Sequence, residues 1–106
     1  MFNLLKNLFS APDQTELLEI MKNKPFLVDV RSREEFQGGS VQGAVNIPLS
    51  SVSRDLKRFA GKNNIVVFCR SGNRSSQAKM ILEQAGISNV YNGGSLQNVQ
   101  NTLNKI

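Results

Sequence analysis

The 106-residue sequence contains no histidine and no tryptophan, and its only cysteine is Cys69. A single cysteine excludes an internal disulfide and a multi-cysteine metal site. Without histidine, a zinc ion has almost no ligands left, so we expect no metal site. The missing histidine also excludes Ser-His and Cys-His pairs. A cysteine nucleophile in this chain must therefore be activated by its electrostatic surroundings alone.

Long apolar runs are also missing. No run approaches membrane-spanning length, so we expect no membrane span. The first nine residues, MFNLLKNLF, carry one charged side chain, Lys6, in their middle. They lack the charged start and long apolar core of a signal peptide, which favours a cytoplasmic location. We expect a short helical extension at residues 1–12 and one domain at residues 13–106.

The charge balance is basic but not extreme. Thirteen Lys and Arg against eight Asp and Glu give a net charge of +5. No basic stripe is interleaved with aromatic residues, so we expect no nucleic-acid partner. We interpret the charge as favouring solubility, with a weak attraction for anionic substrates.

Strand and helix patterns alternate along the chain. Strands are predicted at residues 26–30, 44–47, 65–69 and 89–91. Helices are predicted after Asp13, at residues 33–36, from Ser50 or Ser51 to Gly61, from Ser76 to Gly86, and from Ser95 to the end. Gly93-Gly94 is predicted to turn the chain, and Ile106 to point inward. The connections are long enough for crossovers, which predicts an α/β fold whose mostly parallel central sheet has helices on both faces.

The most informative stretch joins the third of these strands to the helix that follows it. Four apolar residues, Ile65 to Phe68, predict a strand buried on both faces, and Cys69 ends it. Unpaired N–H groups at a helix start, the helix dipole and a flexible Gly72 can together form a pocket for an anion. Arg70 and Arg74 add positive charge. A cysteine in such a field should ionise readily, and the thiolate is the nucleophilic form.

Plainer interpretations exist for each of these residues. A lone cysteine is often only a small buried hydrophobic residue. The two arginines could be solvated loop residues. Asp29 lies at the end of the first predicted strand, where a carboxylate could be catalytic or could hold the following loop by hydrogen bonds, including bonds to Arg31. Both roles for Asp29 are open at this point.

Four motifs carry a resemblance to a known family. They are residues 69–75 (CRSGNRS), residues 27–36 (LVDVRSREEF), residues 39–48 (GSVQGAVNIP) and residues 92–94 (NGG). In this order and spacing they resemble the signatures of rhodanese-type sulfurtransferases, which implies the rhodanese-like fold. Two departures stand out: Ser40 replaces a frequent histidine, and residues 96–98 lack a frequent aromatic. We interpret both as structural positions. The resemblance also favours the role of Asp29 in holding the following loop.

The resemblance also implies a function. Cys69 is the expected catalytic residue, becoming a persulfide by taking sulfur from an anionic donor such as thiosulfate. The acceptor is expected to be cyanide or a dithiol, and a thioredoxin-like protein is a candidate. No cofactor is required. The expected substrate-binding residues are those that follow the cysteine: Arg70, Ser71, Gly72, Asn73, Arg74 and Ser75.

Two alternatives stay open at this point. Phosphatases and arsenate reductases also use a cysteine in an anion-binding loop. Tyrosine-phosphatase-type loops, however, place five residues between the cysteine and the arginine, and here four separate Cys69 from Arg74. The other alternative is a non-catalytic or sulfur-carrier module that binds a protein partner.

Overall fold

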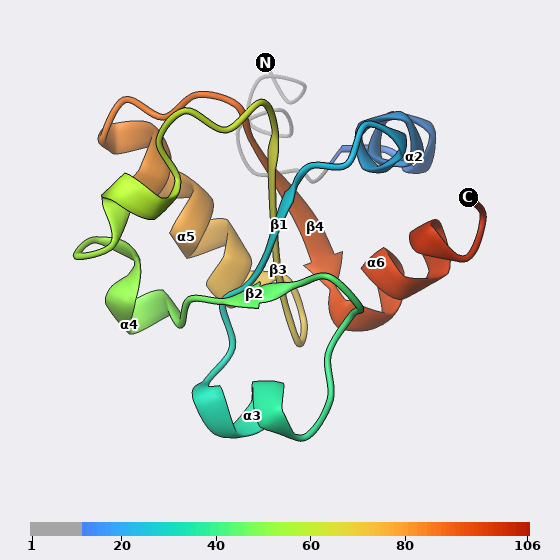
Figure 1. Ribbon diagram of the computed structural model, residues 1–106, viewed down its shortest axis with the longest axis horizontal. Helices are drawn as coiled ribbons and strands as arrows, with labels where there is room; N and C mark the ends of the chain where they lie inside the picture. The colour runs from blue at the N-terminus through green and yellow to red at the C-terminus, as the bar shows by residue number, and fades with distance from the viewer. Residues whose placement is uncertain (1–11) are drawn as a thin grey trace, which may run out of the picture.

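The computed structural model describes residues 12–106 and has a four-stranded parallel sheet at its centre. The strand order is β2-β1-β3-β4, and every pairing among these strands is parallel (Figure 1). The strands are β1 (Phe26–Asp29), β2 (Val45–Asn46), β3 (Ile65–Cys69) and β4 (Val90–Ser95). The α/β prediction is therefore confirmed, while the helical extension predicted for residues 1–12 lies, except for Pro12, outside the described residues.

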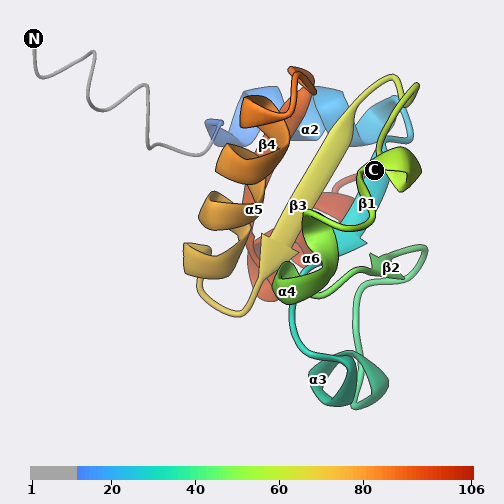
Figure 2. The same ribbon diagram turned by 90° about the vertical axis from the view of Figure 1, so that its left-hand side faces the viewer.

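Helices cover both faces of the sheet, as predicted. Helices α4 (Leu49–Val52) and α5 (Asn73–Gln84) lie on one face, and α2 (Gln14–Lys22) and α6 (Leu96–Leu103) lie on the other (Figure 1). The short helix α3 (Arg33–Gln37) lies beyond the end toward which the strands point (Figure 2). Between residues 12 and 106, no helix is both long and apolar enough to cross a bilayer.

Strand β3 joins the two halves of the core. Its five side chains are all fully buried. Ile65, Val67 and Cys69 pack in the cluster on the α4–α5 side, whereas Val66 and Phe68 pack in the cluster on the α2–α6 side. Each large apolar side chain buried in this way contributes about 1.5–3 kcal/mol. This two-sided burial explains why the strand reads as a continuous apolar run and places Cys69 at its carboxyl end.

The single helix predicted between Ser50 and Gly61 is wrong. Helix α4 ends at Val52, and a separate 3-10 turn, η1, spans Leu56–Arg58. The break falls at residues 53–55, which are Ser-Arg-Asp, and Ser and Asp compete with the helix for backbone hydrogen bonds. The chain still buries Val52 and Phe59 completely, because the two short turns place both side chains against the sheet.

The turn predicted at Gly93-Gly94 is also wrong, because both glycines lie inside strand β4. The register against β3 shifts at this point, and Gly94 has a φ of +82°. A Cβ atom on Gly93 would lie 2.7 Å from Val99 Cγ2 and 2.9 Å from Val66 Cγ1. Gly93 therefore lets helix α6 approach strand β3 closely.

The last helix begins as predicted. The Ser95 side chain accepts a hydrogen bond from the Asn98 N–H at 3.0 Å, which is an N-cap. Val99 and Thr102 are fully buried on its inner face. The inward orientation predicted for Ile106 is wrong: the helix ends at Leu103, and Ile106 is 60% exposed.

Candidate active site

The loop after strand β3 wraps around the sulfur of Cys69. It spans residues 70–72, and Gly72 adopts a φ of +97°, a conformation that favours glycine, immediately before α5 begins. The Gly72 N–H then donates to Cys69 Sγ at 3.0 Å, and the Ser75 N–H donates to it at 3.4 Å. Backbone donors of the loop and of the first helical turn thus converge on one buried sulfur.

Two polar side chains lie next to these backbone donors. We call the Gly72 and Ser75 N–H groups, together with the Ser75 and Asn92 side chains, the cradle of the sulfur. Ser75 Oγ lies 3.4 Å from Cys69 Sγ and donates to Asn92 Oδ1 at 2.7 Å. Asn92 comes from strand β4, and its Nδ2 donates to the Gly72 carbonyl at 3.2 Å. Sequence reasoning used Asn92 only as part of a family motif and did not place it at the site. The available signal was an amide next to a double glycine at the end of an apolar strand pattern.

The cradle changes the acidity of the thiol. Burial raises the pKa of Cys69, but hydrogen bonds from the Ser75 hydroxyl and from the N–H groups of Ser75, Ser71 and Gly72 outweigh it. The net result is a pKa below the ordinary value for cysteine. A cysteine buried merely as a hydrophobic residue would have a raised pKa instead. The site thus favours the thiolate without any histidine.

Arg74 is engaged by a carboxylate that the sequence analysis did not place at the site. Its Nη1 lies 2.7 Å from Glu35 Oε1 and its Nη2 lies 3.1 Å from Glu35 Oε2. This two-pronged bond, with further bonds from Ser32, lowers the pKa of Glu35 to about 2. Since both side chains are only about a third exposed, at 35% and 30%, much of the Arg74 charge is balanced inside the protein.

The other predicted binding residues lie on the outside of the loop. Arg70, Ser71 and Asn73 are exposed, and no side chain of these three bonds to Cys69 within the part of the chain that the structure describes. Arg70 forms no ion pair with a residue in the 12–106 range. Its positive charge is thus turned to solvent, while Gly72 and Ser75 are the predicted residues that touch the sulfur.

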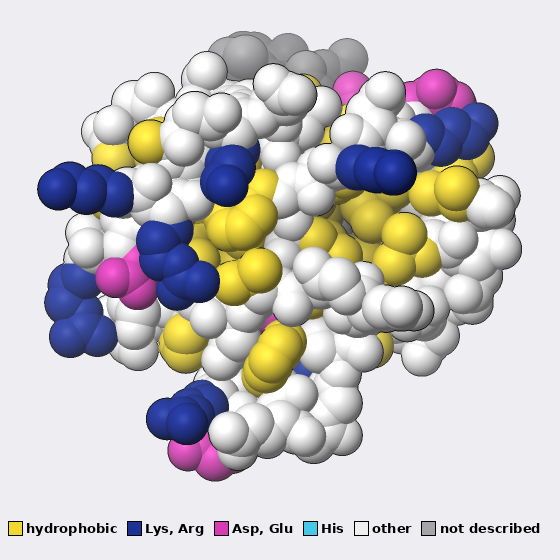
Figure 3. Space-filling model, viewed as in Figure 1, with side chains coloured by type: hydrophobic (Ala, Val, Ile, Leu, Met, Phe, Trp, Pro, Cys, Tyr) yellow, Lys and Arg dark blue, Asp and Glu magenta, His cyan; other side chains and the backbone are white. Residues whose placement is uncertain are grey.

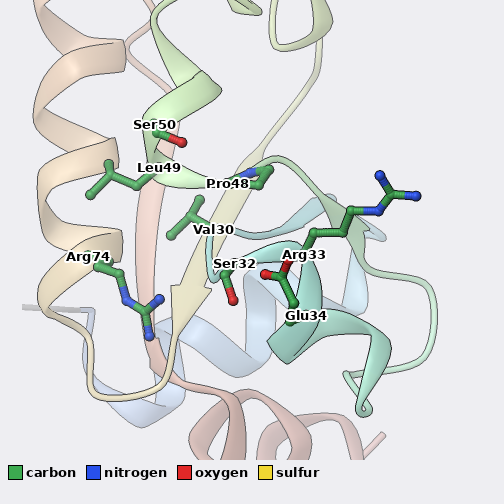
Figure 4. A pocket seen from close by; sticks show the side chains of 8 residues that line it. All are labelled: Val30, Ser32, Arg33, Glu34, Pro48, Leu49, Ser50 and Arg74. Atoms are coloured by element: carbon green, nitrogen blue, oxygen red, sulfur yellow. The ribbon is translucent and has the colours of Figure 1, made fainter.

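A hollow of about 440 Å³ lies at the same end of the sheet (Figure 4). Arg74 forms one wall, the start of α3 at Ser32 and Glu34 forms another, and the segment 48–50 closes it. Val30, at its floor, donates its N–H to the carbonyl of Phe68, the residue before Cys69. Arg74 lies in the first turn of α5, directly after the cysteine loop, whereas Cys69 itself is not among the residues that line the hollow.

Asp29 holds a loop, as the sequence analysis favoured. Its buried carboxylate accepts from the Arg31 N–H at 2.9 Å, from Arg31 Nη2 at 2.8 Å and from Ser40 Oγ at 2.7 Å. Arg31 Nη2 also donates to the Gly39 carbonyl at 2.7 Å. Ser40 thus supplies a donor at the place where a histidine is frequent in the family that the motifs resemble. The carboxylate has no free side from which to act on a substrate.

The basic charge on one face of the molecule is dispersed. Figure 3 shows Lys and Arg side chains as separate spots on the face viewed, several of them beside acidic side chains. On this face the basic side chains therefore do not form one continuous patch.

The sequence of the chain is similar to a family model and to several known proteins. The family model described as rhodanese-like domain matches residues 13–101. The thiosulfate sulfurtransferase PspE of Escherichia coli is 43% identical over 74 residues, which cover 68% of this chain and 71% of PspE. Against two further curated relatives, from Bacillus subtilis and Schizosaccharomyces pombe, the chain spans only 55% and 56% of the relative's length.

Solved structures are similar as well. The human single-domain sulfurtransferase TSTD1 superposes with a TM-score of 0.66 at 28% identity, covering 79% of this chain and 88% of that protein. A rhodanese from Escherichia coli, solved with anions, superposes with a TM-score of 0.62 at 39% identity, covering 68% of this chain and 87% of that one.

Proposed function

We propose that this chain, which belongs to the rhodanese-like domain family, is a sulfurtransferase that uses Cys69 as its sulfur-carrying nucleophile. One observation carries the proposal: a buried sulfur at the end of β3 accepts hydrogen bonds from the Gly72 and Ser75 N–H groups. Such donors stabilise negative charge on sulfur, which is what the reaction needs at its start and at its end.

The first half-reaction takes up sulfur. The Cys69 thiolate attacks the outer sulfur of thiosulfate, the S–S bond of the donor breaks, and sulfite leaves with the electron pair. The charges balance, because a monoanion and a dianion yield a persulfide monoanion and a sulfite dianion. The exposed Arg70 offers positive potential in the cysteine loop, and the hollow bordered by Arg74 offers space for such a donor. PspE, named as a thiosulfate sulfurtransferase, supports this choice of donor.

The second half-reaction releases sulfur. A nucleophilic acceptor, such as cyanide or a thiol, attacks the outer sulfur of the persulfide, and Cys69 leaves as a thiolate. The N–H groups that stabilised the attacking thiolate now stabilise the leaving one, so the same cradle serves both steps. A thioredoxin-like protein is a candidate source of the thiol.

A phosphatase mechanism has less support. The loop is one residue shorter than in tyrosine-phosphatase-type sites, with four residues between Cys69 and Arg74. Arg74 also directs its guanidinium to Glu35. A phosphate would have to compete with that carboxylate for the arginine.

The test is the intact mass of the protein before and after incubation with thiosulfate. We expect the wild-type protein to gain the mass of one sulfur atom and Cys69→Ser to gain nothing, because the variant lacks the only thiol. The added sulfur should leave again on incubation with cyanide or a dithiol. A gain on Cys69→Ser would refute the role of Cys69, and no gain on either protein would refute thiosulfate as donor. A stable persulfide that only a protein thiol discharges would indicate a carrier.

A further inference from the structure

The Ser75 hydroxyl lies between two groups that can accept its hydrogen. Its oxygen is 2.7 Å from Asn92 Oδ1 and 3.4 Å from Cys69 Sγ. A serine hydroxyl carries one hydrogen, so it can donate to only one of them at a time. Asn92 Oδ1 and Cys69 Sγ therefore compete for that one hydrogen.

The amide of Asn92 cannot turn around to become a donor toward Ser75. Its Nδ2 donates to the Gly72 carbonyl at 3.2 Å, and its Oδ1 accepts from the Gly94 N–H at 2.9 Å. A flipped amide would place its oxygen against a carbonyl and its NH₂ against an N–H, and both bonds would be lost. Because Asn92 is only 7% exposed, water cannot readily replace them. Its oxygen is thus a permanent acceptor for Ser75.

The two charge states of the sulfur call for opposite directions of the hydroxyl. A neutral thiol can donate its S–H to Ser75 Oγ, and the Ser75 hydroxyl then donates its own hydrogen bond to Asn92 Oδ1. A thiolate has no hydrogen and attracts the hydroxyl, and hydrogen bonds to a charged acceptor are about twice as strong as neutral ones. Asn92 Oδ1 still keeps its bond from the Gly94 N–H when the hydroxyl turns away.

We propose that Asn92 is a positioning residue. Its Oδ1 accepts the hydrogen bond from the Ser75 hydroxyl while the Cys69 sulfur is uncharged, and it loses that hydrogen bond to the sulfur when the sulfur becomes a thiolate. Its use in sulfur transfer rests on the proposed function. Forming the persulfide makes Sγ neutral and moves the charge to the outer sulfur, so the hydroxyl returns to Asn92. When an acceptor removes the outer sulfur, the hydroxyl turns back to the thiolate. The hydrogen stays bonded to Ser75 Oγ throughout.

Other charges around the sulfur must be the same in the two variants that each comparison sets against one another. Arg70 follows Cys69 in the loop, Arg74 belongs to α5, and its partner Glu35 comes from α3. Asp29, at the end of β1, also acts on Arg74. Substitutions at Ser75 and Asn92 leave all four side chains in place.

The experiment is a double-mutant cycle of Ser75→Ala and Asn92→Leu. The readout is the pH midpoint at which thiolate absorbance appears, and Cys69 is the only thiol in the chain. Ser75→Ala should raise this midpoint, since it removes a donor to the thiolate. The rise should be larger by roughly half a pH unit in the Asn92→Leu background, where the hydroxyl has no competing acceptor. Equal rises in both backgrounds would overturn the proposal.

A second cycle keeps the proposal testable if Asn92→Leu does not fold. Asn92→Asp strengthens the acceptor and adds one negative charge, which is present both with and without the Ser75 hydroxyl and therefore cancels within the cycle. The rise caused by Ser75→Ala should become smaller than in the wild-type background; an unchanged or larger rise contradicts the proposal. Asn98→Leu is the matched control, because Asn98 Nδ2 donates to the Gly93 carbonyl at 2.7 Å without touching the cysteine loop. It should leave the Ser75→Ala rise unchanged, and an altered rise would assign the coupling to β4 in general. The titration uses no sulfur donor, so its failure is distinct from a failure to take up sulfur.

Discussion

Two parallel strands of the sheet end side by side, each with a buried group held by polar partners, and the partners are charged at one strand end and neutral at the other. At the end of β1, the Asp29 carboxylate is matched by a full positive charge on Arg31 and by the Ser40 hydroxyl. At the end of β3, the Cys69 sulfur is surrounded by neutral donors, the N–H groups of Gly72 and Ser75 and the hydroxyl of Ser75. Both groups are completely buried.

The difference separates a structural cluster from a reactive one. A buried carboxylate paired with a guanidinium is held in one state, and its hydrogen bonds tie β1 to the loop that contains Gly39 and Ser40. Neutral donors stabilise a negative sulfur without saturating it, which is what the proposed sulfur transfer requires of Cys69. Under the proposed function, the same edge of one sheet thus supplies rigidity at one strand and chemistry at the next.

The largest effect should come from breaking the structural cluster. Asp29→Ala leaves the buried Arg31 guanidinium unpaired and should lower the free energy of unfolding by about 3–5 kcal/mol. Urea denaturation measures this loss. Ser40→Ala, which removes only one neutral donor from the same carboxylate, should cost about 1 kcal/mol. A similar small loss for both variants would show that the ion pair contributes little beyond its hydrogen bonds.

A smaller effect is expected from charges beside the reactive cluster. Arg74→Ala leaves Glu35 unpaired beside the hollow proposed for the donor and should raise the KM for thiosulfate by roughly tenfold, equivalent to about 1.4 kcal/mol. Adding Glu35→Gln should recover most of this loss, because the unpaired carboxylate that repels thiosulfate is then gone. This outcome is expected if Arg74 acts mainly by neutralising Glu35. Steady-state kinetics with thiosulfate and cyanide measure both. If the double variant binds thiosulfate as poorly as Arg74→Ala, Arg74 contacts the donor directly.

The smallest effect is a pH dependence of stability at the Glu35–Arg74 pair. The folded pKa of Glu35 is lowered from 4.5 to about 2, mainly by the hydrogen bonds from Arg74. The stabilisation is therefore complete above pH 4.5, declines as the pH falls toward about 2, and is absent below that. Denaturation of the wild type and Glu35→Gln across this range should show their difference in stability shrinking with acidification. Glu34→Gln, which removes a neighbouring exposed carboxylate, serves as the control, and a constant difference for Glu35→Gln would exclude the linkage.

Much of the fold was predictable because its signals are local. The apolar run from Ile65 to Phe68 predicts a strand buried on both sides, and β3 spans Ile65–Cys69. Ser95 was predicted to begin the last helix and does cap it. The break in the helix after Pro48 and the strand at Gly93-Gly94 were missed, because weak helix formers and glycines take their conformation from the packing around them.

By itself, the sequence determined that this protein has one thiol, no histidine to activate it, and a glycine-bearing loop after a buried strand. Those facts depend only on composition and on neighbours in the chain. Only the tertiary structure decided which groups meet the sulfur and which do not: Asn92 reaches Ser75 of helix α5 from strand β4, and Glu35 reaches Arg74 of the same helix from helix α3. These partners lie 17 and 39 residues apart in the chain. The carboxyl ends of parallel strands bring such distant residues to one edge of the sheet. A local sequence pattern does not indicate which of them will meet there.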